Sequence, residues 1–73
     1  MIEWKHYKDH KIKACSQKLI DTRWMPVGIA WLSTGGKEHI KVVPGELIEI
    51  RPTEEEADRI AIKKVQQWVD QRS

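Results

Sequence analysis

Apolar residues near the C-terminal end of the chain recur every three or four positions. They fall in one stripe if successive residues advance by about 100°, as in an amphipathic helix with one face to bury. The members of the stripe are Ala57, Ile60, Ala61, Ile62, Val65, Trp68 and Val69. Thr53 and Glu56 precede it with the spacing of a capping box, in which each side chain bonds the backbone amide of the other residue. The pattern predicts a helix over about 54–71.

Upstream of this helix, apolar and polar residues alternate, as they do in β-strands with one buried face. The alternating stretches are 2–7, 11–19, 24–32, 38–43 and 46–51. Both alternating sets of 24–32 are apolar, and we expect one of them to face the core. That set is Met25, Val27, Ile29 and Trp31. Pro26 cannot donate a ladder hydrogen bond, so we expect an edge, a bulge or the beginning of a strand there.

Turn residues separate the predicted strands. Gly35 and Gly36 allow the positive φ values that a tight hairpin turn requires. Pro44 and Gly45 match the two central positions of a type II turn, where proline presets φ and glycine accepts a positive value. These short connections predict that strands adjacent in sequence pair in antiparallel fashion.

The predicted elements indicate an α+β fold, an antiparallel β-meander of three to five strands with one C-terminal amphipathic helix packed on one face. We expect a single domain over 1–73, with the sheet in about 2–51 and the helix in about 54–71. A chain of 73 residues is too short to build a second hydrophobic core. Residues 2–7 could form a strand or a loose arm, because alternation at a terminus is a weak signal.

Several motifs resemble those of small uncharacterised bacterial proteins in which a β-meander precedes a helix. The motifs are Tyr7-Lys8 with Ile12, the Trp24 to Pro26 strand, the glycine hairpin, Thr53 to Ala57 and Trp68 to Asp70. The β-β-β-α part is also similar in outline to HicB-type antitoxins and, in shape, to double-stranded-RNA-binding folds. The resemblance implies the fold, and it brings no catalytic motif.

Composition narrows the classes of protein that fit the chain. Thirteen Lys and Arg against eleven Asp and Glu give a net charge of +2, and such a balanced composition is typical of a folded domain. Cys15 is the only cysteine, so no intrachain disulfide can form. No apolar stretch approaches the roughly 20 residues that span a bilayer, and the first residues lack the apolar segment of a signal peptide. We expect a cytoplasmic protein that does not associate with membranes.

No motif predicts enzymatic chemistry. His6 and His10 flank a predicted turn and His39 lies on another hairpin, without the paired spacing of a zinc site. No motif pairs Cys15 with a histidine and an acid. The segment 33–37 lies between two predicted strands, whereas a phosphate-binding loop precedes a helix. We expect no catalytic residues, no cofactor and no metal.

Basic residues are concentrated at the beginning of the chain, where the first 20 residues carry five lysines against two acids. Lysines beside aromatic residues are typical of surfaces that bind nucleic acids. The candidate contacts are Lys5, Lys8, Lys11, Lys13, Lys18 and Tyr7. One hypothesis is therefore a nucleic-acid-binding regulator that uses the Lys-rich first hairpin. The structural alternative is that lysines protect a strand edge from aggregation.

The favoured hypothesis is a small binding or protein-interaction module. One helix can cover only one face of a sheet, so the other face and an edge strand remain for a protein partner or a homodimer. Trp24 and Trp31 are the candidate interface residues, because both faces of their strand are apolar. Apolar pairing tolerates salt, whereas binding to a nucleic-acid backbone weakens as salt rises, so salt dependence separates the hypotheses.

Overall fold

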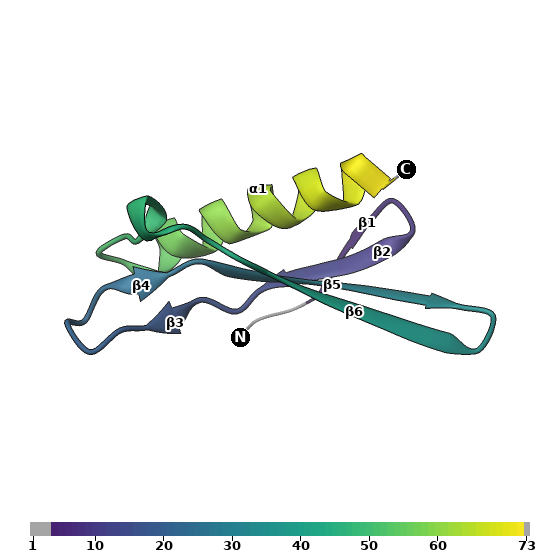
Figure 1. Cartoon of the computed structure of the whole chain (residues 1–73), viewed down its shortest axis with the longest axis horizontal. Coiled ribbons are helices and arrows are strands. Elements are labelled where there is room, and N and C mark those ends of the chain that lie inside the picture. The colour runs from purple at the N-terminus through teal and green to yellow at the C-terminus, as the bar shows by residue number, and fades with distance from the viewer. Residues whose placement is uncertain (1–3, 73) are drawn as a thin grey trace.

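A computed structural model describes residues 4–72 as two layers, a sheet and the single helix that covers one of its faces (Figure 1). The main sheet is antiparallel and has the strand order β1-β2-β5-β6. Its strands are β1 (Lys5–Tyr7), β2 (His10–Ala14), β5 (Val27–Thr34) and β6 (Lys37–Pro44). The other elements are β3 (Gln17–Lys18), its partner β4 (Trp24–Met25), the 3₁₀ helix η1 (Leu47–Glu49) and α1 (Glu54–Arg72). The predicted α+β fold is confirmed.

Helix α1 begins and ends close to the predicted residues. The backbone N–H of Glu56 donates to the Thr53 hydroxyl at 3.3 Å, which is the first half of the predicted capping box. The Glu56 carboxylate accepts from the Thr53 hydroxyl at 3.2 Å. Three glutamates in the first turn suit the positive end of the helix dipole, as Arg72 suits the negative end in the last turn.

The face of β5 that meets the helix is the opposite of the predicted one. Gly28 and Ala30 are buried under α1, whereas Val27, Ile29 and Trp31 are half-buried on the other face. A Cβ on Gly28 would lie 2.8 Å from the backbone oxygen of Ala61, so the helix approaches too closely for any side chain at this position. The small residues face the core because they allow this close approach, and the prediction that the larger set faces it was wrong.

The core therefore joins small and branched side chains of three elements. The fully buried residues of α1 are Ala57, Ala61, Val65 and Val69. Ile12 from β2 and Ala30 from β5 meet them from the sheet, and Trp68 packs at the border of this cluster. The predicted helix stripe is thus the core-facing side of α1, with Ala61 closest to Gly28 of the sheet.

Residues 46–51, predicted as a strand or an extended segment, contain the 3₁₀ helix η1 instead. The Glu49 carboxylate accepts from the Glu46 N–H at 2.6 Å and lies 3.1 Å from the ammonium of Lys64 in α1. These contacts favour a short 3₁₀ helix over an extended segment. The type II turn expected at Pro44-Gly45 is also absent, since Gly45 does not have a positive φ and its N–H donates to the Pro26 carbonyl at 2.8 Å.

The hairpin between β5 and β6 turns at Gly35 and Gly36, whose φ values are 58° and 80°. Positive φ at both positions is the signature of a type I′ turn. The hairpin extends past the end of α1 (Figure 1). Its far part is therefore covered by no helix.

Candidate functional site

The surface of the main sheet opposite α1, here called the open face, is the first candidate site. It carries alternate residues of β2, β5 and β6, paired across the sheet as Lys13 with Ile29 and Val42, and as Lys11 with Trp31 and Ile40. Two of these apolar side chains are largely exposed, Ile40 at 67% and Val42 at 51%. An apolar sheet face that no element covers is typical of a surface that another molecule covers.

Two tryptophans and two lysines pack together on the open face. The rings of Trp4 and Trp31 are 5.6 Å apart and tilted by 59°. The Lys11 ammonium lies 5.0 Å from the Trp31 ring and the Lys13 ammonium 4.6 Å from the Trp4 ring. Both cations therefore sit on ring faces at the distance of a cation–π interaction. Trp31, a predicted interface residue, belongs to this surface.

The other candidate lysines do not join this surface. Lys5 pairs with Ile12 in the sheet, so it lies on the helix side, where it shares a surface depression with Glu54 and Asp58. Lys18 lies in β3, in the separate two-stranded sheet. The structure thus brings together Lys11 and Lys13 but distributes the remaining candidates over other surfaces.

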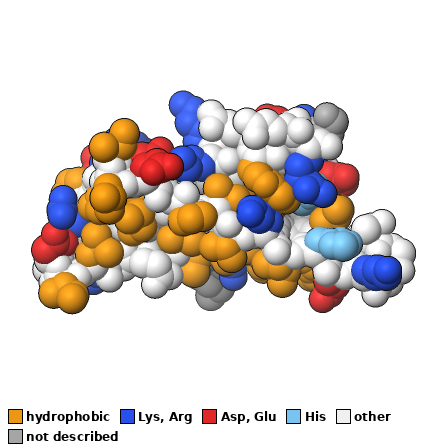
Figure 2. Space-filling model, viewed as in Figure 1, with side chains coloured by type: hydrophobic (Ala, Val, Ile, Leu, Met, Phe, Trp, Pro, Cys, Tyr) orange, Lys and Arg blue, Asp and Glu red, His pale blue; other side chains and the backbone are white. Residues whose placement is uncertain are grey.

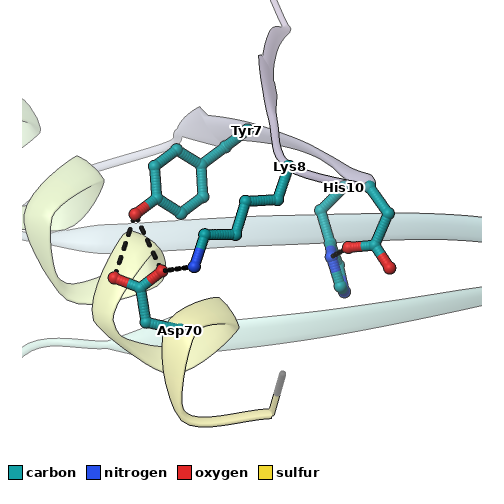
Figure 3. A network of polar contacts seen from close by, with 5 residues as sticks. Tyr7, Lys8, His10 and Asp70 are labelled. Atoms are coloured by element: carbon teal, nitrogen blue, oxygen red, sulfur yellow. Dashed lines mark hydrogen bonds and ion pairs between the residues drawn. The ribbon is translucent and has the colours of Figure 1, made fainter.

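Tyr7 and Lys8 bind the end of α1 instead (Figure 3). The Tyr7 hydroxyl donates to both carboxylate oxygens of Asp70, at 2.8 and 2.9 Å, and the Lys8 ammonium lies 2.7 Å from one of them. These contacts lower the pKa of Asp70, with the bond from Lys8 as the largest cause, and raise the pKa values of Tyr7 and Lys8. The network ties the β1–β2 turn to the last turn of the helix.

Trp24 has a structural role in the second sheet. The backbone N–H of Trp24 donates to the Arg51 carbonyl at 2.8 Å, and the backbone N–H of Arg51 donates to the Trp24 carbonyl at 3.0 Å. Lys18 pairs with it from β3. The side chain of Trp24 is half-buried and belongs to the two-stranded sheet, whereas Trp31 lies on the open face of the main sheet.

Strand β6 is a free edge of the main sheet. It is the last strand of the order β1-β2-β5-β6 and has 8 residues, all of them exposed except the half-buried Val43. The backbone N–H of Gly45 donates to the Pro26 carbonyl, so the backbone groups of these two residues point toward each other. The carbonyl of Val27, the first residue of β5, instead accepts from the backbone N–H of Cys15, just after β2, and therefore points away from β6. Because ladder bonds alternate, Ile40 and Val42 direct their backbone N–H and C=O groups outward. These groups are available to an added strand.

A cavity of about 220 Å³ lies between β6 and the end of α1, on the side of the sheet opposite the open face. It is here called the basic cavity, and its polar and aromatic lining consists of His10, His39, Lys41, Trp68 and Arg72. None of the described residues that line it is acidic. Figure 2 shows Lys, Arg and His side chains gathered at this end of the molecule.

The walls of the basic cavity are held in place by aromatic contacts. The His10 ring meets the Trp68 ring edge-on at 5.9 Å and 88°, and the Arg72 guanidinium lies 4.8 Å from the same ring. His10 is buried, and its Nδ1 lies 2.7 Å from the Asp9 carboxylate. That contact fixes the orientation of the imidazole.

Sequence reasoning missed the basic cavity because its residues come from three distant segments. One local signal was present, the alternation of Lys37, His39 and Lys41 with Glu38 and Ile40 along one strand. It would have predicted a strand that is basic on one face and mainly apolar on the other.

The described residues, 4–72, contain no group of three or more His, Cys, Asp or Glu side chains that could hold a metal ion. Within the same part of the chain, no helix has the length and apolar character needed to cross a membrane. Comparison with models of protein families, with curated proteins and with solved structures found no match.

Proposed function

We propose that this protein is a non-enzymatic interaction module, which binds an extended segment of another protein along β6 and the adjoining open face. Such β-augmentation obtains affinity from main-chain hydrogen bonds and specificity from alternate side chains. The free β6 edge carries the proposal, because its outward N–H and C=O groups adjoin exposed Ile40 and Val42. The single Cys15 supports a cytoplasmic setting for this binding.

The shape of the sheet explains why β6 is the better of the two edges. β1, at the other edge, has only 3 residues, and its last residue, Tyr7, is tied to Asp70 of α1. β6 has 8 residues and projects with its hairpin beyond the helix. A partner strand therefore has a longer and less obstructed edge at β6.

A single-stranded nucleic acid on the open face is the second candidate, supported by the Trp4–Trp31 pair with Lys11 and Lys13. Aromatic side chains beside cations form stacking platforms for bases. The two ammonium groups already occupy ring faces, however, at 5.0 and 4.6 Å. Bases that stack on these faces would have to displace the lysines, which makes this candidate the weaker one.

The first experiment is an NMR titration that measures how a strand-forming probe changes the amide chemical shifts of isotope-labelled protein. The oligomeric state of the protein is measured beforehand. The probe is a segment as long as β6, 8 residues, in which Val alternates with Gln, displayed at the end of a monomeric carrier domain. We expect shifts confined to β6 and the open face. Ile40→Lys should weaken them, and Leu47→Lys is the matched control, since Leu47 is equally apolar but lies outside this surface with 78% exposure.

The second experiment repeats the titration with short single- and double-stranded DNA and RNA, at low and then physiological salt. Shifts on Lys11, Lys13 and Trp31 that fade as salt rises would favour the nucleic-acid candidate. The interaction module is refuted if no strand probe of any charge shifts the amides of β6.

A further inference from the structure

We propose that the partner segment is acidic on one face and apolar on the other, and that its acidic side chains enter the basic cavity. This inference rests on the proposed function, since it requires a strand along β6. It adds the chemistry of the partner, which the edge alone does not specify.

The two faces of β6 have different chemistry. Lys37, His39 and Lys41 pair with Thr34, Leu32 and Ala30, which places them on the helix side of the sheet. Glu38, Ile40 and Val42 pair with Ser33, Trp31 and Ile29 and lie on the open face. A strand added at this edge places its own alternate residues beside these two sets, because neighbours across strands share a face.

The helix side of β6 has a deficit of negative charge. Among the described residues, Lys37 and Lys41 form no ion pair. Asp9, which lines an adjoining cavity together with His10 and Arg72, is engaged by His10 at 2.7 Å. Arg72 stabilises the negative end of the helix dipole, whereas the basic residues of β6 have no such structural role. Carboxylates of a neighbouring strand would complement them.

The same charges disfavour a second copy of this chain as the occupant. If two β6 strands paired in antiparallel fashion with their faces matched and centred on His39, Lys37 of one copy would lie opposite Lys41 of the other, and if they were centred on Ile40, Lys41 would lie opposite His39. Like charges directly opposite each other are destabilising across strands. An acidic–apolar segment avoids this repulsion and places its apolar side chains beside Ile40 and Val42.

The volume of the basic cavity also suits side chains rather than a whole ligand. At about 220 Å³ it lies below the roughly 300 to 1,000 Å³ of typical small-molecule sites. It opens beside β6, where Lys41 and His39 contribute to its lining. One or two carboxylate side chains of an adjacent strand can occupy it without displacing Trp68.

The experiment compares three carrier-displayed segments in which Val alternates with Glu, Gln or Lys. At low salt we expect the Glu segment to bind about tenfold more tightly than the Gln segment, from several opposite-charge pairs across strands. Salt should reduce this ratio, and the Lys segment should bind least. Lys41→Glu should abolish the preference for Glu, whereas Lys63→Glu, an equal charge change at an exposed helix residue, should preserve it.

Each contrary outcome has a separate meaning. Equal binding of the Glu and Gln segments would overturn the acidic preference and leave the interaction module intact. Absence of binding by all three segments would overturn both proposals, and the lysines would then serve to protect the edge from aggregation. A homodimer whose interface shifts map to β6 would replace the acidic partner with a second copy.

Discussion

The two faces of the main sheet are built from the same strands but have opposite packing. On the helix side, small residues such as Gly28 and Ala30 allow α1 to approach closely, and Ile12 is almost completely buried. On the open face, Ile40 is largely exposed, and the larger Trp31 is covered only in part, by Trp4 and Lys11. The smaller side chains face the core because only they allow the helix to approach so closely, and the larger apolar residues are left for a different contact.

The largest expected effect is on the close contact beneath α1. Gly28→Val should destabilise the protein by about 3 kcal/mol, because its Cβ would meet the Ala61 backbone oxygen at 2.8 Å and the helix would have to move. Valine favours strands more than glycine does, so a loss must come from the helix contact. Urea unfolding measures it, and Ser33→Val, on the exposed part of the same strand, is the control. Equal stability of the two variants would contradict the close packing.

An intermediate effect is expected when the stability losses at a buried valine and at a valine of the open face are compared. Val65→Ala should cost about 2 kcal/mol, because it removes two methyl groups from a side chain that is 0% exposed. Val42→Ala makes the same chemical change on the open face and should cost less than about 0.5 kcal/mol in the free protein. A similar loss in both variants would mean that the open face is covered in solution, as by a second copy.

The smallest effect concerns the network that joins the β1–β2 turn to α1. The contacts of Asp70 with Lys8 and Tyr7 lower its pKa below the usual 3.8. A lowered carboxyl pKa contributes stability above pH 3.8 that is lost as pH falls through the pKa in the folded protein. The raised pKa of Tyr7, usually 10.0, has the opposite sign, so its contribution is lost at alkaline pH as Tyr7 ionises.

We therefore expect Asp70→Asn to flatten the dependence of the urea midpoint on pH below 3.8. Asp21→Asn is an informative comparison, because the pKa of Asp21 is also lowered, by Arg23, in the loop between β3 and β4. Acid profiles of the parent and Asp70→Asn that run parallel would show that the network adds nothing to stability. Added salt should reduce the effect, since all three groups are accessible to solvent.

Local patterns predicted much of the fold. The apolar stripe and Thr53 located α1 to within about a residue, and the paired glycines located the β5–β6 turn. Alternation failed where it was ambiguous. Both sets of 24–32 are apolar, so the pattern did not show which set faces the core. The alternation of 46–51 predicted an extended segment, but the contacts of Glu49 with Glu46 and Lys64 favour a 3₁₀ helix. Periodicity describes which residues share a face but contains no information about which face another element will cover.

The candidate site was less predictable than the fold. Five lysines close together in the first 20 residues suggested one basic surface, but strand alternation sends Lys5 and Lys11 to opposite faces. The basic cavity combines His10, the β6 residues His39 and Lys41, and the end of α1. Proximity in sequence predicted a lysine surface larger than the one observed and gave no sign of the basic cavity. Side-chain direction and strand order decide which charged residues lie together.

The sequence by itself determined most of the elements of this protein, their order and the amphipathic character of α1, because periodicity and turn chemistry are local properties. The tertiary structure decided which face of the sheet became the core, since that depended on how closely Ala61 could approach Gly28. It also decided that β6 would be the free edge and that the basic face of this strand would lie on the helix side. Contacts between distant segments fix these features, and no short stretch of the chain specifies them.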